Sequence, residues 1–165
     1  MWELYAFWAL VPLIVASRLS GPALSLAAFV TIAVGFIGCV GGGVLVRRFG
    51  GARVACAQLA TSGLCCLAAP WLLDAGPAVF AAWMLVWGIT VVGDSPQFSA
   101  LSADAAPREL VGSVLTIINC IGFALTAILI PVFAEAVASW SLERVLPFLA
   151  IGPLAGLAAM RRLLR

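Results

Sequence analysis

The sequence contains no histidine, and all nine of its basic residues are arginine. The lack of histidine removes the commonest general base, metal ligand and pH-sensitive side chain. Charged residues make up only 10% of the chain, whereas a soluble domain carries about a quarter. No polar segment is long enough to fold as a soluble domain. Enzyme chemistry is therefore not expected, because no nucleophile–base pair or carboxylate dyad is evident.

Hydrophobic residues make up 64% of the 165 residues. This composition predicts an all-α, polytopic membrane protein. The five cysteines fall within apolar runs, without the spacing of a zinc site. They are Cys39, Cys56, Cys65, Cys66 and Cys120, and we interpret them as small hydrophobic residues in helices. We expect no metal and no other cofactor.

Apolar runs between charges and Gly/Pro breaks predict six transmembrane helices, since a span needs roughly 20 apolar residues. The predicted spans are about 2–17, 23–46, 54–73, 78–98, 110–137 and 145–163. A polar connector is expected over 99–109. All six belong to a single transmembrane domain, 1–165.

Arginine placement predicts the orientation of the spans. Seven arginines fall on one side of the membrane: Arg47, Arg48, Arg53, Arg108, Arg161, Arg162 and Arg165. Only Arg18 and Arg144 fall on the other side. The positive-inside rule then places both termini in the cytoplasm, in a plasma or inner membrane. The N-terminus has no positively charged leader and enters a span at once, so we expect the chain to be part of something longer.

Glycines in the second predicted span recur every three or four residues, with Gly38 and Gly42 forming a GxxxG pair. Helices in lipid associate through close packing of small residues. We therefore interpret these glycines as helix-packing positions rather than as ligand contacts.

Asp94 lies near the end of the fourth predicted span, where we place it at the cytoplasmic rim. Ionisable groups within a span are functional candidates by default. One hypothesis is a gating ion pair or proton-relay carboxylate. The alternative is a solvated helix-end carboxylate, or one paired with Arg48 or Arg108.

A stripe of small and polar residues follows one face of the fifth predicted span. It consists of Gly112, Thr116, Asn119, Gly122 and Thr126. The stripe either lines a water-filled path or joins two helices through hydrogen bonds. Asn119 is the main candidate, because a buried amide needs partners.

Aromatic residues gather in the first and fourth predicted spans. Glu3 and Trp2 are expected near the cytoplasmic interface. Tyr5 and Trp8 could face a cavity, and Trp83 and Trp87 share one helix face, where they either stack on a substrate or fill a packing gap.

The segment between the second and third predicted spans resembles a cytoplasmic motif of the major facilitator superfamily. That motif is a Gly, three residues, an acid, an Arg, one residue, a Gly and then basic residues. Gly43, Arg48, Gly50 and Arg53 match it, whereas Arg47 stands in place of the acid. The connector 107–112 and the opening segment 2–12 are also similar to those of bacterial members.

This resemblance covers essentially the whole chain and implies helices seven to twelve, the C-terminal half of such a transporter. It implies that the first and fourth spans line the path. The second and fifth would pack against the other half, and the third and sixth would face lipid. It extends to prokaryotic anion porters of the nitrate/nitrite type. The gating and coupling candidates are Glu3, Asp94, Arg48, Arg53 and Arg108.

The leading functional hypothesis is transport of a small solute by alternating access, with proton coupling, beside an N-terminal half or a second copy of the chain. The alternative is a non-transporting membrane scaffold or assembly subunit, or an inactive fragment of a transporter. Neither hypothesis involves nucleic acid.

Overall fold

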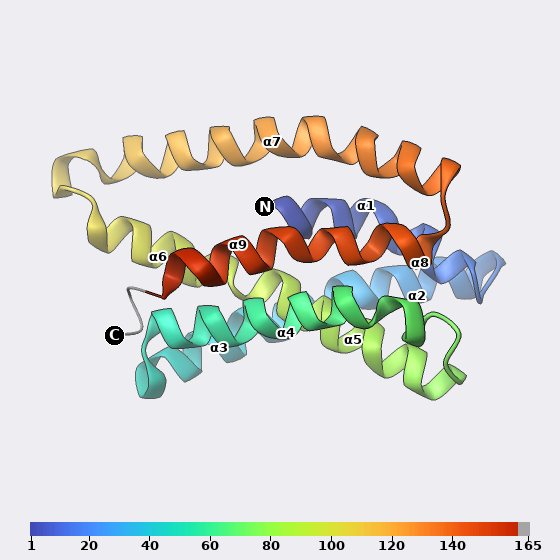
Figure 1. Cartoon of the computed structure of the whole chain (residues 1–165). Helices are drawn as coiled ribbons and strands as arrows, with labels where there is room; N and C mark the ends of the chain where they lie inside the picture. The colour runs from blue at the N-terminus through green and yellow to red at the C-terminus, as the bar shows by residue number, and fades with distance from the viewer. Residues whose placement is uncertain (162–165) are drawn as a thin grey trace.

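The computed structural model describes residues 1–161 as helices joined by short turns (Figure 1). The elements are α1 (Trp2–Ala16), α2 (Gly21–Ala33), α3 (Gly35–Phe49), α4 (Gly51–Leu72), α5 (Pro77–Gly93), α6 (Ser95–Ala105), η1 (Arg108–Leu110), α7 (Val111–Ser139), α8 (Leu142–Val145), η2 (Leu146–Ala150) and α9 (Ile151–Met160). This part of the chain contains no β-strand, which confirms the all-α prediction. Arg162, Arg165 and the predicted end of the last span lie outside the described residues.

Five continuous helical stretches are long and apolar enough to cross a membrane. They are Gly21–Phe49, Gly51–Leu72, Pro77–Ala105, Arg108–Ser139 and Leu142–Met160. The first helix, α1, has only 15 residues and is about 22 Å long, shorter than the roughly 30 Å hydrocarbon core. It begins midway along the bundle (Figure 1). Residues 1–161 therefore form a membrane-type helical bundle, in which five rather than six helical stretches are long enough to span.

The helices extend further than the hydropathy runs suggested. The fourth predicted span continues as helix to Ala105, so most of the expected connector 99–109 is helical. The second predicted span continues to Phe49, and the expected loop after it shrinks to Gly50. Gly50 has φ of +84°, a conformation that other residues adopt at a cost, so glycine permits this abrupt reversal. Arg48 and Arg53 consequently lie on helix ends.

A glycine seam holds α2 and α3 against α5. A Cβ at Gly38 would overlap the carbonyl oxygen of Ile89, and one at Gly88 would overlap that of Thr31. Gly42 would likewise collide with the amide of Gln58, at 3.0 Å, and with that of Gln97. The neighbouring backbones at Gly38 and Gly88, and the two amide side chains at Gly42, come this close because glycine has no side chain, which confirms a packing role for Gly38 and Gly42.

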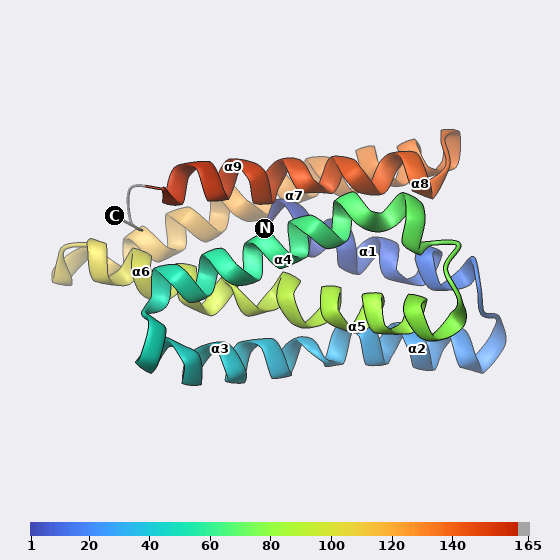
Figure 2. The ribbon, with the colours of Figure 1, turned by 60° about the horizontal axis from the view of Figure 1, so that its bottom comes forward.

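The third span, α4, lies at the centre of the bundle. It runs between α5 and α9, with α2 and α3 beyond α5 (Figure 2). Half of its most apolar 18-residue segment is buried inside the bundle, against 17% for the stretch that contains α7. This differs from the peripheral, lipid-facing position that the family resemblance implies for the third span.

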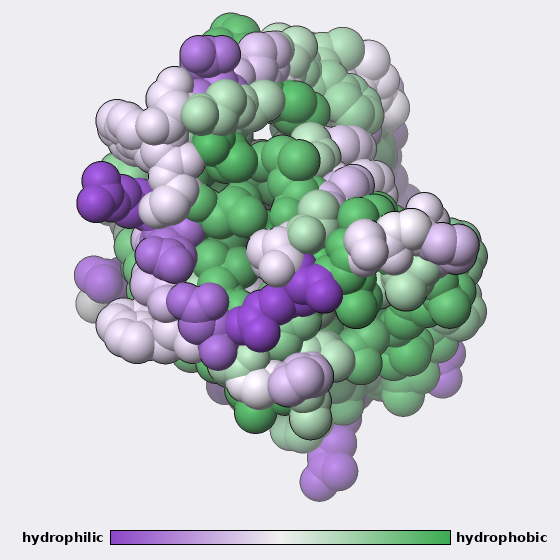
Figure 3. Space-filling view, turned by 90° about the vertical axis from the view of Figure 1, so that its right-hand side faces the viewer, coloured by the Kyte–Doolittle hydropathy of each residue, from purple (hydrophilic) through white to green (hydrophobic). Residues whose placement is uncertain are grey.

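The described arginines lie at the two ends of the bundle, on the sides that the helix directions require. Arg48, Arg53 and Arg108 lie at the end where α3 finishes and α7 begins. Arg18 lies at the opposite end, where its Nε donates to the carbonyl oxygen of Leu73 at 2.9 Å and its guanidinium pairs with Asp74 at 3.7 Å. Figure 3 looks onto this end, where hydrophilic side chains gather over a largely hydrophobic surface. The pair fastens the α1–α2 turn to the α4–α5 turn.

The glycine seam makes a first prediction. Gly38→Ala should lower the free energy of unfolding by about 1–3 kcal/mol, because the added methyl group forces α3 away from the backbone of α5. Thermal unfolding in detergent, followed by tryptophan fluorescence, measures the change.

Gly41→Ala is the matched control on the same helix. A Cβ there meets nothing within 4 Å, so the helix should gain up to about 1 kcal/mol. Equal melting temperatures for the two variants would contradict the seam.

Candidate functional site

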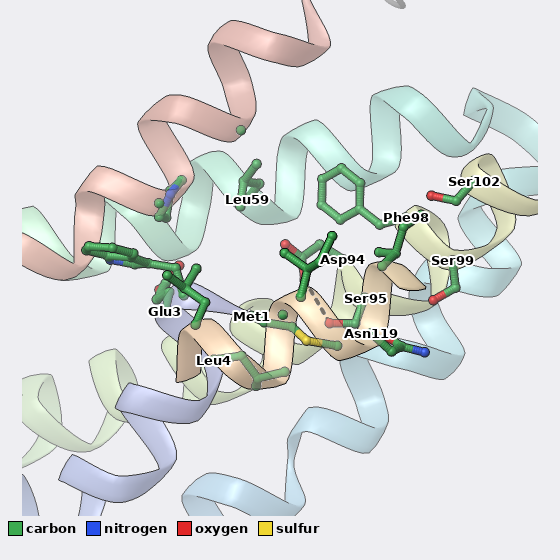
Figure 4. Close-up of a pocket in the computed structure, with 18 of the residues that line it drawn as sticks. Met1, Glu3, Leu4, Leu59, Asp94, Ser95, Phe98, Ser99, Ser102 and Asn119 are labelled. Atoms are coloured by element: carbon green, nitrogen blue, oxygen red, sulfur yellow. Dashed lines mark hydrogen bonds between the residues drawn. The ribbon is translucent and has the colours of Figure 1, made fainter. Parts of the chain in front are cut away.

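A cavity of about 420 Å³ opens between α1, α6, α7 and α9. Figure 4 shows Glu3 and Asp94 on its wall, together with serines of α6 and Asn119 of α7. The cavity lies beside the N-terminal end of α1, which starts midway along the bundle. Two acidic residues therefore line a space within the helical bundle, where charge is costly and marks candidate functional sites.

Glu3 is buried, with 5% of its surface exposed. Its Oε1 accepts hydrogen bonds from Trp87 Nε1 at 2.7 Å and from Cys66 Sγ at 3.2 Å, and its Oε2 accepts one from Ser62 Oγ at 3.0 Å. Three donors from α4 and α5 thus converge on one carboxyl group of α1. Such hydrogen bonding is what a buried carboxylate requires.

Helix packing places Glu3 there. Phe7, Leu10 and Ile14 follow it at helical spacing, and all three are almost fully buried. The ring of Phe7 lies 4.4 Å from that of Trp87. The apolar face of α1 is therefore anchored in the core, and this anchoring carries Glu3 inward. Our expectation of Glu3 and Trp2 at the cytoplasmic interface is wrong, because α1 starts inside the bundle.

Asp94 occupies the break between α5 and α6. Seventeen helical residues precede it and eleven follow it. Pro96 has no N–H for the carbonyl group of Val92, which instead faces the thiol of Cys39 at 3.8 Å. The break thus removes the helical partner of the Val92 carbonyl group, whereas the carbonyl oxygen of Asp94 still accepts from Phe98 N at 3.0 Å.

The predicted arginine partners of Asp94 are absent. Asp94 is 9% exposed, and its carboxyl group accepts only a weak hydrogen bond from Ser95 Oγ, at 3.4 Å, within the described residues. Arg48 and Arg108 are exposed at the end of the bundle, and neither forms an ion pair within the described chain. The placement of Asp94 at a solvated rim is therefore also wrong, since the helix continues well past it.

The four aromatic candidates divide into two pairs. Trp83 and Trp87 are buried, with ring centroids 5.2 Å apart, and Trp83 Nε1 donates to the carbonyl oxygen of Cys65 at 3.1 Å. Tyr5 and Trp8 are half-buried and meet edge to face at 5.5 Å. None of the four lines the cavity, so packing accounts for their contacts in this structure.

The polar stripe of α7 reaches the cavity through Asn119 and Gly122. Thr116 and Thr126 instead bond the carbonyl oxygens of Gly112 and Gly122 one turn earlier, each at 2.8 Å. The hydroxyl groups of the two threonines therefore form hydrogen bonds within α7 rather than to a second described helix. Asn119 is the polar side chain of the stripe that lines the cavity.

Several site residues escaped the sequence reasoning. The sequence pattern favours a packing role for Cys66 and does not single out Ser62, although their spacing of four places two donors on one face of α4. Ser95, Ser99 and Ser102 line the cavity at helical spacing, a signal hidden by the connector assigned to this segment.

Comparison with protein-family models, with curated proteins and with solved structures found no match to this chain.

The carboxyl cluster makes a second prediction. Trp87→Phe should lower the free energy of unfolding by about 1.5–3 kcal/mol through the lost bond to a charged acceptor. In a Glu3→Gln background the same change should cost less, because the acceptor is neutral. Thermal unfolding of the four proteins gives the coupling energy.

Trp140→Phe is the control, since Trp140 is 56% exposed and its loss should change stability little. If Trp87→Phe costs the same in both backgrounds, the bond to Glu3 does not stabilise the bundle.

Proposed function

We propose that this chain is a six-helix half of a secondary transporter of the major facilitator type, which carries a small solute by alternating access. The observation that carries the proposal is the cavity between α1, α6, α7 and α9, with Glu3 and Asp94 on its wall. A scaffold gains nothing from two carboxyl groups inside an apolar bundle, whereas a solute path needs polar groups there.

The break between α5 and α6 supports this proposal. Transporter sites are typically built where a membrane helix is interrupted, because the interruption frees polar groups at depth. Asp94 is the residue at the interruption and one wall of the cavity. Glu3 and Asp94 are accordingly the candidate carriers of a coupling proton.

A second six-helix unit completes the proposed transporter, either an N-terminal half or another copy of this chain. Only 22% of the most apolar 18-residue segment is buried in the stretch that contains α2 and α3, and only 17% in the stretch that contains α7. These least buried stretches supply apolar surface for a partner as well as for lipid. On the arginine bias, we place the chain in a plasma or inner membrane with both termini cytoplasmic.

One observation favours the scaffold alternative. Arg47 stands where the family's motif has an acid, and it is exposed near the end of α3 without an ion-pair partner in the described residues. An inactive descendant of a transporter would tolerate such a loss. The distinguishing property is whether the cavity opens to both sides of the membrane.

Thiol labelling in membranes makes the third prediction. In a background without native cysteines, with Cys66→Ser keeping a donor for Glu3, Ser99→Cys should react with an impermeant maleimide. Because alternating access opens the cavity to each side in turn, the reagent should label this position from either side.

Ser17→Cys, in the turn after α1, is the matched control and should react from the extracellular side alone. A thiol at position 99 that reacts from one side only would rule out alternating access for this chain and favour the scaffold.

A further inference from the structure

The charged side chains on the cavity wall have one sign. Glu3 and Asp94 are the charged side chains that line it, and none of the described arginines does. The remaining wall is hydroxyl, amide and apolar, and includes Trp2 and Phe98. The α-amino group of Met1 acts on both carboxyl groups at a distance but forms no ion pair with either. The side chains of this site thus favour a positive ligand.

The two carboxyl groups are not equivalent. Both oxygens of Glu3 already accept hydrogen bonds, three in all. Asp94 is nine-tenths buried, faces the cavity in Figure 4, and has only the 3.4 Å contact from Ser95. A buried charge without a partner is costly, so a cation beside it is strongly favoured. Asp94 is therefore the group open to a ligand, and Glu3 is a positioning residue.

The wall also carries aromatic side chains. Trp2 and Phe98 both line the cavity. Indole and phenyl faces attract cations, and quaternary ammonium groups in particular. The cavity volume of about 420 Å³ lies within the range of roughly 300–1,000 Å³ that holds drug-sized molecules.

We propose that the cavity binds a lipophilic organic cation, with its charge against Asp94 and its apolar body against Trp2 and Phe98. As the identity of the transported solute, this rests on the proposed function, whereas binding itself is measured without transport. A carboxylate-lined cavity repels anions, so this ligand class replaces the nitrate-like solutes implied by the family resemblance.

Two probes of nearly the same size and opposite charge test the proposal. Equilibrium binding of radiolabelled tetraphenylphosphonium to the full chain in nanodiscs should be saturable. Tetraphenylborate should show no saturable binding. If the borate binds as tightly as the phosphonium, the cavity recognises only apolar bulk and the proposal is overturned.

Substitutions of Asp94 test whether its negative charge binds the cation. Asp94→Asn should weaken phosphonium binding at least about tenfold, and Asp94→Glu should retain it, which separates lost charge from misfolding. Asp104→Asn, in α6 but exposed, should bind as the unaltered chain does. Undiminished binding by Asp94→Asn, or equal loss with Asp104→Asn, overturns the proposal.

The binding experiment tests the cation site, and the thiol labelling tests the transporter, so either proposal can fail without the other. Saturable phosphonium binding with one-sided labelling at position 99 would sustain the site and reject the transporter. Two-sided labelling without phosphonium binding would sustain transport and reject the cation.

Discussion

A carboxyl group within an apolar bundle must find donors inside the protein, and the arrangement of α1, α4 and α5 depends on that requirement at Glu3. Trp87, Ser62 and Cys66 meet on its two oxygens from two other helices. Since the contact fixes both the depth and the rotation of α1, it also fixes the Trp87–Phe7 packing beside it. One polar cluster thereby orients much of the core.

The glycine seam provides the second constraint. Gly38 lets the backbone of α3 touch α5, and Gly88 lets the backbone of α5 touch α2. These contacts hold α5 up to the point where Pro96 interrupts the helix. Asp94 sits at that point. The seam and the interruption together present one carboxyl group to the cavity, while the donors of α4 and α5 hold the other at its edge.

The sequence predicted the coarse architecture well because hydropathy and small-residue spacing are local properties. The all-α bundle and the packing role of Gly38 and Gly42 followed from them. The depth of Glu3 and Asp94 did not, since it depends on where each helix starts and stops. Treating residues 99–109 as a loop moved Asp94 to a rim, and Cys66 became a donor only when α1 brought a carboxyl group to it.

The account depends on a hydrated, acidic cavity lying inside the bilayer. Spin labels at Ser99, on the cavity wall, and at Phe36, 72% exposed on α3, test this most directly. Power saturation with oxygen and with a water-soluble nickel chelate reports lipid and water access. We predict strong nickel access at position 99, at a depth within the hydrocarbon core, and oxygen access alone at position 36. Oxygen access alone at both positions would show a lipid-filled groove and contradict the account.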